Sequence, residues 1–350
     1  MIKKIFITIF INILFVILID FVFGIIFNTP KYLSKKNYDW GMYHSNYRGY
    51  FDKLDKDGET VYGIDYSKVK YDNIKPPTSD YDGLKVVAIG DSFTEGQGVR
   101  RTDTYSNMLS LLTNDQVRGF NHGKGGDDIY QVTNRFLAKE FDFKPDVIIY
   151  GYCINDIPNF NYDIALDIDN NKERAKEYKN DYPLKWDFIN LRTNAVENSR
   201  SKLLKFFTDH SNIINYFARQ IELKDISRRT TEYYLKTHDE KFNPKGIEKL
   251  KEQILKMKAK ADEYGAQFTL MIFPIIFWPN GEYPFSPIHE KMRQIAKELD
   301  IDVIDLKDTF LKYPDSELWV HPVDQHPNDF AQKITSEKII EYLKQKDLLK

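Results

Sequence analysis

Residues 84–98 read LKVVAIGDSFTEGQG, and this stretch decides the fold. The residues at 86–89 form a short, continuous apolar run, which is typical of a strand buried on both faces of a parallel sheet. Gly90 follows it and permits a sharp exit, because glycine has no Cβ. Ser92 is therefore predicted at the carboxyl end of a parallel strand, where open α/β sheets bind their ligands.

Two interpretations of Ser92 remain open at this point: a reactive residue, or a capping serine in an ordinary strand-to-helix turn. The stretch is not the nucleophile elbow G-x-S-x-G, because Thr94 stands where its second glycine would be. It is not a phosphate-binding loop either, because no Gly-Lys-Ser/Thr follows the glycines. The choice depends on the rest of the chain.

The bulk composition excludes several classes of function. A chain of 350 residues with 42% hydrophobic residues can bury the core of one large domain or two small ones. The net charge is −2 and no arginine-rich tract occurs, so nucleic acid is not an expected partner. Cys153 is the single cysteine, which rules out an intrachain disulfide or a cysteine-rich metal site, and its expected role is core packing. We predict neither a cofactor nor a bound metal.

The N-terminus reads as a membrane anchor. Ile5 to Phe27 is 23 residues long and carries one charge, Asp20, so it is long and apolar enough to cross a bilayer. A signal peptide would have a shorter apolar core and an A-x-A-like cleavage site, which is absent here. The alternative is a buried core helix, although a helix apolar on every side at the terminus does not favour it. We therefore predict an uncleaved transmembrane anchor over residues 1–27.

The orientation of the anchor does not follow from the flanking charges. Two lysines precede the apolar segment and Lys31, Lys35 and Lys36 follow it, so the positive-inside count favours neither side. An extracytoplasmic main domain is preferred, because a lone N-terminal span usually acts as an export signal.

The remainder divides into a juxtamembrane segment, 28–83, and a domain, 84–350. The first is rich in Tyr, Lys, Asp and Asn and closes with KPPTSD, whereas the second alternates strand and helix patterns. Such alternation predicts a parallel sheet with helices on both faces. The predicted strands are 84–90, 117–121, 146–152, 267–273 and 302–306, and the predicted helices are 103–112 (with Asp103 as N-cap), 127–141, 244–264, 287–299 and 329–346.

One connection, at about 156–243, is too long for a simple crossover and is interpreted as an insertion. Insertions at the carboxyl end of a sheet commonly shape the binding site. Apolar residues at helical spacing predict an amphipathic helix there, and most of them are expected to pack in the core of an extra helical subdomain. They are Leu203, Phe206, Phe207, Ile213, Ile214, Phe217 and Ile221.

Further polar and glycine motifs follow other predicted strands. Asn121 and the glycines up to Gly126 form a turn whose backbone amides can point into a cleft. Asn155 follows the third strand, and Asp324 and His326 are placed on a loop after the fifth. Turn and capping roles explain each motif alone. Four such motifs, all at carboxyl ends of strands in one sheet, are much less likely to arise by coincidence.

With these motifs the sequence resembles the SGNH hydrolases, also called the GDSL lipase/esterase superfamily. The first block matches Gly90-Asp91-Ser92, and the second matches Asn121 with its glycines. The third matches Gly151 with Asn155 and Asp156, more widely spaced than in the commonest form, and the last matches Asp324 and His326, one residue closer together than in Asp-x-x-His. The resemblance covers roughly 84–157 and 300–347. It implies a flavodoxin-like three-layer αβα sandwich with a five-stranded parallel sheet in the order 2-1-3-4-5.

The resemblance also implies roles for these residues. Ser92 is the nucleophile, His326 its general base and Asp324 the residue that orients the imidazole. The backbone amides of Ser92 and Gly126 and the side-chain amide of Asn155 form the oxyanion hole. His321 is a rival base, but its nearest upstream aspartate is Asp315, six residues away.

These features predict a membrane-anchored serine esterase or acyltransferase acting on ester-linked acyl groups, with acetyl on a cell-envelope glycan as the favoured substrate. Exposed aromatic residues, as in Asn37 to Phe51, suit sugar rings, although core and surface packing explains them equally well. The alternative is a non-catalytic envelope-assembly protein that keeps the fold as a glycan-binding module. A secreted lipase is disfavoured by the anchor.

Overall fold

The computed structural model describes residues 2–26, 75–157, 210–278, 281–321 and 324–349, together with 203, 206 and 207. The chain divides into two compact units. One comprises residues 1–39 and 172–233, and the other comprises residues 40–171 and 234–350. The predicted juxtamembrane segment and the insertion lie largely outside the described residues.

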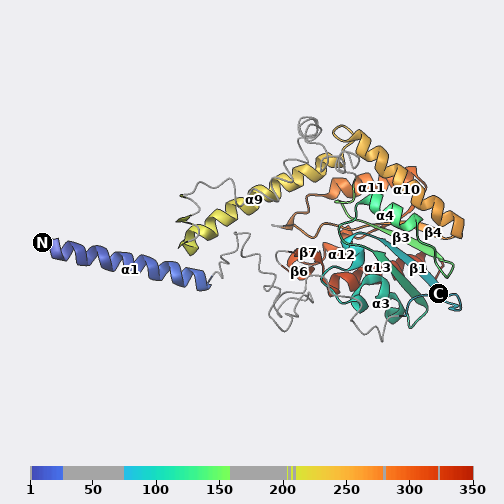
Figure 1. Ribbon diagram of the computed structural model, residues 1–350, viewed down its shortest axis with the longest axis horizontal. Helices are drawn as coiled ribbons and strands as arrows, with labels where there is room; N and C mark the ends of the chain where they lie inside the picture. Colours follow the sequence, from blue (N-terminus) through green and yellow to red (C-terminus); the bar gives the residue numbers. More distant parts are fainter. Residues whose placement is uncertain are drawn as a thin grey trace. The chain divides into compact units, whose positions relative to one another are not determined.

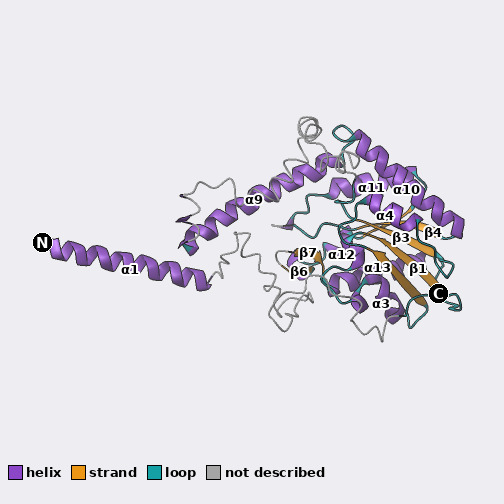
Figure 2. Cartoon of the chain, viewed as in Figure 1, coloured by secondary structure: helices purple, strands orange, loops and turns teal. Residues whose placement is uncertain are grey.

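The larger unit is built on a parallel sheet whose strand order, β2-β1-β3-β4-β5, confirms the expected 2-1-3-4-5 topology (Figures 1 and 2). In register, Gly90 at the end of the first strand is paired with Gly123 on one side and Gly151 on the other. The carboxyl ends of the first three strands are therefore level, which places their following loops at one edge. The strands are β1 (Leu84–Gly90), β2 (Val117–Gly123), β3 (Val147–Tyr152), β4 (Gln267–Ile272) and β5 (Asp302–Asp305).

Helices cover both faces of this sheet, so the domain has three layers (Figure 1). α3 (Tyr105–Leu112) and α13 (Asp329–Gln345) pack together on one face, and α4 (Ile129–Leu137) and α10 (Pro244–Tyr264) pack together on the other. α11 (Ser286–Glu298) packs on β4 and β5. Alternate strand residues face opposite layers, so Val86 and Ala88 join the same buried cluster as Tyr105 and Ile334.

The structure corrects two local predictions about how helices start. Asp103 is not the N-cap of α3. It ends a short 3₁₀ turn, Arg101–Asp103, and the extended Thr104 precedes the helix without a side-chain cap. α4 is shorter at both ends than the predicted 127–141, and Asp128 is its N-cap. The Asp128 carboxylate accepts from the N–H groups of Tyr130 and Gln131, and the Gln131 side chain accepts from the Asp128 N–H.

The segment predicted as a loop after the fifth strand contains a small antiparallel pair instead. β6 (Trp319–His321) pairs with β7 (Asp324–Pro327), so His326 is held in a strand. Backbone ladder bonds restrict a strand more than an open loop, which suits a residue that must meet a distant partner. Two short helices, α2 (Ser92–Glu95) and α12 (Lys307–Phe310), also follow β1 and β5.

A buried histidine, His238, lies just after α9 (Asn212–Thr237). The Nε2 atom of His238 is 2.6 Å from the hydroxyl of Tyr152, and its Nδ1 is 2.8 Å from the carbonyl oxygen of Tyr234. A neutral ring with its proton on Nδ1 satisfies both contacts, since the carbonyl can only accept. Complete burial lowers the pKa of His238 to about 4.

The unfolded chain therefore binds a proton at His238 between about pH 6.5 and 4 that the folded chain does not. We expect the free energy of unfolding to fall by about 3 kcal/mol as pH drops through this window. Urea titrations of the wild type and His238→Gln at several pH values measure this. The wild type should lose more stability than the variant, and parallel pH curves would contradict the assignment.

In the smaller unit, α1 (Ile2–Ile26) is a single apolar helix whose side chains are largely exposed. It is long and apolar enough to cross a membrane, and no other helix in the described parts of the chain meets that test. Phe27, the last residue of the predicted span, lies outside the described residues.

The expectation that the apolar residues of the insertion pack in a core is wrong for five of them. Leu203, Phe206, Phe207, Ile214 and Phe217 are all exposed, whereas Ile213 is half-buried. Asp20 and Phe23 of α1 contact the start of α9. The helical periodicity itself is confirmed from Asn212 onward.

Candidate active site

Ser92 is the first residue of α2, directly after β1, and is nearly buried. Asp91 caps the helix by accepting from the N–H of Phe93 at 2.9 Å. Gly90 is required for this turn: a Cβ there would lie 2.2 Å from Thr94 Oγ1 and 2.7 Å from the carbonyl oxygen of Gly151. The glycine thus lets α2 fold back onto the end of the sheet and fixes Ser92 at its edge.

His326 meets Ser92 although 234 residues separate them. Its Nε2 atom lies 2.8 Å from Ser92 Oγ, within hydrogen-bond distance. The imidazole also packs against the ring of Phe93, with 5.2 Å between the ring centroids. The structure therefore brings together a hydroxyl and the base that could take its proton.

Asn155 reaches the same place from the end of β3. Its Nδ2 donates to Asp91 Oδ2 at 3.0 Å, and its own side chain is exposed. An amide nitrogen carries two hydrogens, so one can remain for a ligand. Complete burial raises the pKa of Asp91, and the hydrogen bonds from Asn155 and Phe93 oppose that rise.

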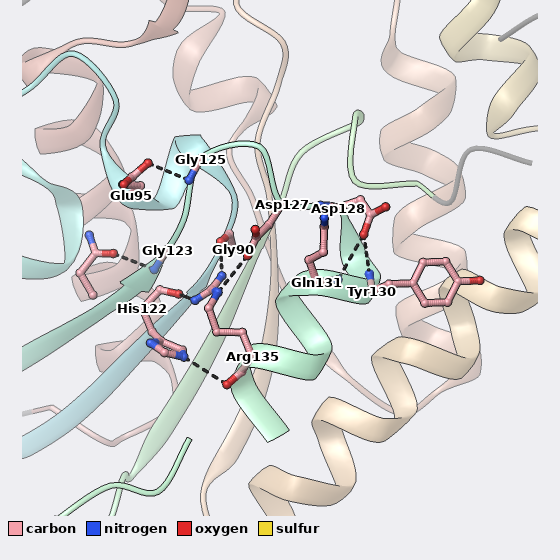
Figure 3. Close-up of polar contacts among 11 residues, drawn as sticks. Gly90, Glu95, His122, Gly123, Gly125, Asp127, Asp128, Tyr130, Gln131 and Arg135 are labelled. Atoms are coloured by element: carbon pink, nitrogen blue, oxygen red, sulfur yellow. Dashed lines mark hydrogen bonds and ion pairs between the residues drawn. The ribbon is translucent and has the colours of Figure 1, made fainter. Parts of the chain in front are cut away.

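Gly126 lies in the turn after β2 with φ of +81°, a conformation that favours glycine. Within the described part of the chain, neither its backbone N–H nor that of Ser92 donates to another group. The turn is tied to α2, since Gly125 N–H donates to Glu95 Oε2 at 2.7 Å (Figure 3). The backbone N–H groups of Ser92 and Gly126 are thus left to donate to a ligand, and the turn that carries Gly126 is held in place by its bond to α2.

Arg135 of α4 braces the same turn, as Figure 3 shows. Its guanidinium donates to Asp127 Oδ2 at 2.8 Å, to the carbonyl oxygen of Gly90 at 3.1 Å and to that of His122. It thereby joins the ends of β1 and β2 to the residue that follows Gly126. Arg135 was not among the residues predicted from the sequence. Asp127 precedes α4, which begins at Ile129, so helical spacing does not link the two residues.

We expect Arg135→Lys to lower kcat for ester turnover by about ten- to a hundredfold with little change in KM, because a lysine cannot reproduce the three-way fork. Arg118→Lys is the matched control. Arg118 makes a similar forked contact with Asp115 at the opposite end of β2. Steady-state kinetics with thermal unfolding of both variants checks this, and equal kcat values for the two would contradict the bracing role.

Asp156, in the third block, is completely buried. Its Oδ2 accepts from the Tyr150 hydroxyl at 2.9 Å and from the Cys153 N–H at 3.2 Å, and burial raises its pKa well above the usual range. It therefore shapes the loop that carries Asn155. Cys153 is buried in the core cluster, as expected.

The backbone of Asp324 is paired with that of His321 across β6 and β7. The side chains of both residues lie outside what the structure describes, so the orienter of His326 stays a prediction. Across the described residues, no group of three or more His, Cys, Asp or Glu side chains is placed to hold a metal ion.

The structure is thus an α/β protein with a hydroxyl–imidazole pair at the carboxyl edge of an open parallel sheet, where such folds bind ligands. The chain belongs to the GDSL-like lipase/acylhydrolase family, whose model matches residues 88–334. Lipases and acylhydrolases are enzymes that hydrolyse ester bonds.

Solved structures similar to this chain share little sequence with it. An acetyl xylan esterase is 15% identical, with a TM-score of 0.39, over 74% of this chain and 100% of its own. A member of the lipolytic G-D-S-L family from Veillonella parvula is 11% identical, with a TM-score of 0.39, over 75% and 100%. A lipase/acylhydrolase from Enterococcus faecalis is 13% identical, with a TM-score of 0.38, over 75% and 96%. No curated protein matches the sequence.

Proposed function

We propose that this chain is a serine esterase or acyltransferase that acts on ester-linked acyl groups through Ser92 and His326. The observation that carries the proposal is the 2.8 Å contact between Ser92 Oγ and His326 Nε2 at the carboxyl edge of the sheet. A serine hydroxyl is a weak nucleophile by itself and needs an adjacent base.

The chemistry follows from this pair. His326 Nε2 takes the proton as Ser92 Oγ attacks the ester carbonyl carbon, and the resulting oxyanion receives hydrogen bonds from the N–H groups of Ser92 and Gly126 and the amide of Asn155. The tetrahedral intermediate collapses, and His326 gives the proton to the departing alcohol. The acyl-serine is then attacked by water in hydrolysis or by an acceptor hydroxyl in transfer, and His326 takes the proton of the attacking group. The acyl–Ser92 bond breaks, and His326 returns the proton to Ser92 Oγ.

The substrate proposed is an acylated polymer of the cell envelope, with acetyl on a glycan as the first candidate. α1 supports this location, since an anchored enzyme works at the membrane rather than in free solution. We propose that α1 is a single transmembrane anchor and that the larger unit lies outside the cytoplasm.

The test uses the full chain in detergent micelles. Hydrolysis of p-nitrophenyl acetate, propionate and butyrate is measured, and a fluorescent alkyl phosphonate is added to trap the nucleophile. We expect turnover that falls with acyl length, and one phosphonate adduct on the peptide that contains Ser92. No turnover and no adduct would favour a non-catalytic glycan-binding module. Adding a soluble oligosaccharide and measuring acylated product separates transfer from hydrolysis.

A further inference from the structure

Asp20, the charged residue within the apolar part of α1, is bonded to the beginning of α9. Its Oδ1 accepts from Ser211 Oγ at 2.7 Å and from the Ile213 N–H at 3.1 Å, and its Oδ2 accepts from the Asn212 N–H at 2.9 Å. These backbone groups belong to the first turn of a helix, where N–H groups have no intrahelical acceptor and the helix dipole is positive. Asp20 thus caps a helix that lies 192 residues further along the chain.

Exposed apolar side chains lie on both sides of the start of α9: three precede the helix and two are in its first two turns. The exposed fractions are 67% for Leu203, 56% for Phe206, 44% for Phe207, 38% for Ile214 and 57% for Phe217. These five residues are called the apolar end here. Exposing several large apolar side chains to water is unfavourable, and exposed apolar patches often mark interaction surfaces.

Contact with α1 places the apolar end at a definite distance from the last residue of that helix. Asp20 lies six residues before Ile26, the last residue of α1, which at 1.5 Å per residue is about 9 Å along the helix. Phe23, between them, packs against the rings of Tyr216 and Phe217, with centroids 5.4 and 6.5 Å apart. Amphipathic helices that lie on membranes bury their apolar face about 5–10 Å into the boundary between headgroups and acyl chains.

We propose that the apolar end inserts into the lipid bilayer beside α1, with Asp20 fixing its depth. The inference rests on the proposed anchoring by α1 and is independent of the ester chemistry. It also accounts for a carboxylate inside an apolar span. A charge there is costly unless it is paired, and the N–H groups of α9 supply its partners. Lipid covers the exposed apolar end, because this end is bonded to α1 and the proposed anchor is itself surrounded by lipid.

The experiment exploits Cys153, which is buried, so an introduced surface cysteine is the accessible thiol. Phe206→Cys and Phe217→Cys chains are labelled with an environment-sensitive fluorophore and reconstituted in phosphatidylcholine vesicles containing doxyl-labelled lipid. Leu255→Cys is the control, because Leu255 is an exposed apolar residue of α10 in the larger unit. We expect at least threefold stronger quenching at 206 and 217 than at 255. Equal quenching at the three positions would overturn the proposal, as would failure of the chain to float with the vesicles.

A second variant tests the role of Asp20. In the labelled Phe217→Cys chain, Asp20→Ala should reduce the lipid quenching at least twofold, because the first turn of α9 loses its acceptor. Thr8→Ala is the control, since Thr8 Oγ1 donates only within α1, to the carbonyl of Lys4. Unchanged quenching in Asp20→Ala would show that Asp20 does not set the depth. None of these readouts uses ester turnover, so they are unaffected if the proposed chemistry fails.

Discussion

Replacing Ser92 by alanine should lower kcat for ester hydrolysis by about 10⁴-fold or more, because it removes the hydroxyl that lies 2.8 Å from His326 Nε2. The loss should appear in kcat and in kcat/KM together, since the nucleophile acts in the transition state. Thermal unfolding should change little, because the alanine keeps the Cβ of a nearly buried residue.

His326→Ala should be as inactive as Ser92→Ala, and the double variant should be no worse than either, because the two residues act as one unit. Ser286→Ala, at the start of α11, is the control and should keep the wild-type rate. Stopped-time assays with a chromogenic acetate ester measure all four chains. Losses that multiply in the double variant, or a Ser92→Ala enzyme that still turns over, would show that the reaction does not use this pair.

The fold was largely predictable because its information is local. Continuous apolar runs mark strands buried on both faces, and regular alternation with helices leaves few topologies. The match between predicted and observed β1, Leu84–Gly90, shows how well glycine and a polar residue mark the end of such a run. The helix starts were less predictable, because an acidic residue such as Asp103 caps a helix only if the backbone there is extended.

The site was predictable only where side chains with distinctive chemistry occur. Ser92 and His326 could be paired by the family resemblance, although nothing local links residues so far apart. Arg135 could not, because it acts on the carbonyl oxygens of Gly90 and His122, and every residue has such an oxygen. The sequence does not show which backbone carbonyl a side chain will bind, so the role of Arg135 could be recognised only in the structure.

The apolar residues near α9 show a different limit. Helical periodicity states that residues share a face, but it does not state whether protein, lipid or water covers that face. Phe206 and Phe217 fit a protein core and a membrane surface equally well by pattern. Only their exposure and the link to Asp20 favour the membrane.

Asp324→Asn should lower kcat by about 10³- to 10⁴-fold with little loss of stability, if the aspartate orients His326. The expectation rests on β7, which contains both residues. Residues two apart in a strand share a face and are separated by about 6.6 Å, a span that an aspartate and an imidazole can bridge. The aspartate would then hold the proton on Nδ1, leave Nε2 free to accept from Ser92, and stabilise the imidazolium. Asparagine keeps the shape but supplies an amide that favours the wrong tautomer.

Asp315→Asn is the matched control, because Asp315 is the other aspartate shortly before the histidines. Its Oδ2 accepts from the Trp278 N–H at 3.0 Å, a contact that an asparagine oxygen can still make. The control should therefore turn over at nearly the wild-type rate. Kinetics of both variants and of His326→Ala on one acetate ester separate two mechanisms. A slow Asp324→Asn enzyme means a Ser-His-Asp triad, whereas a fast one beside an inactive His326→Ala means a Ser-His dyad whose imidazole is held by another acceptor.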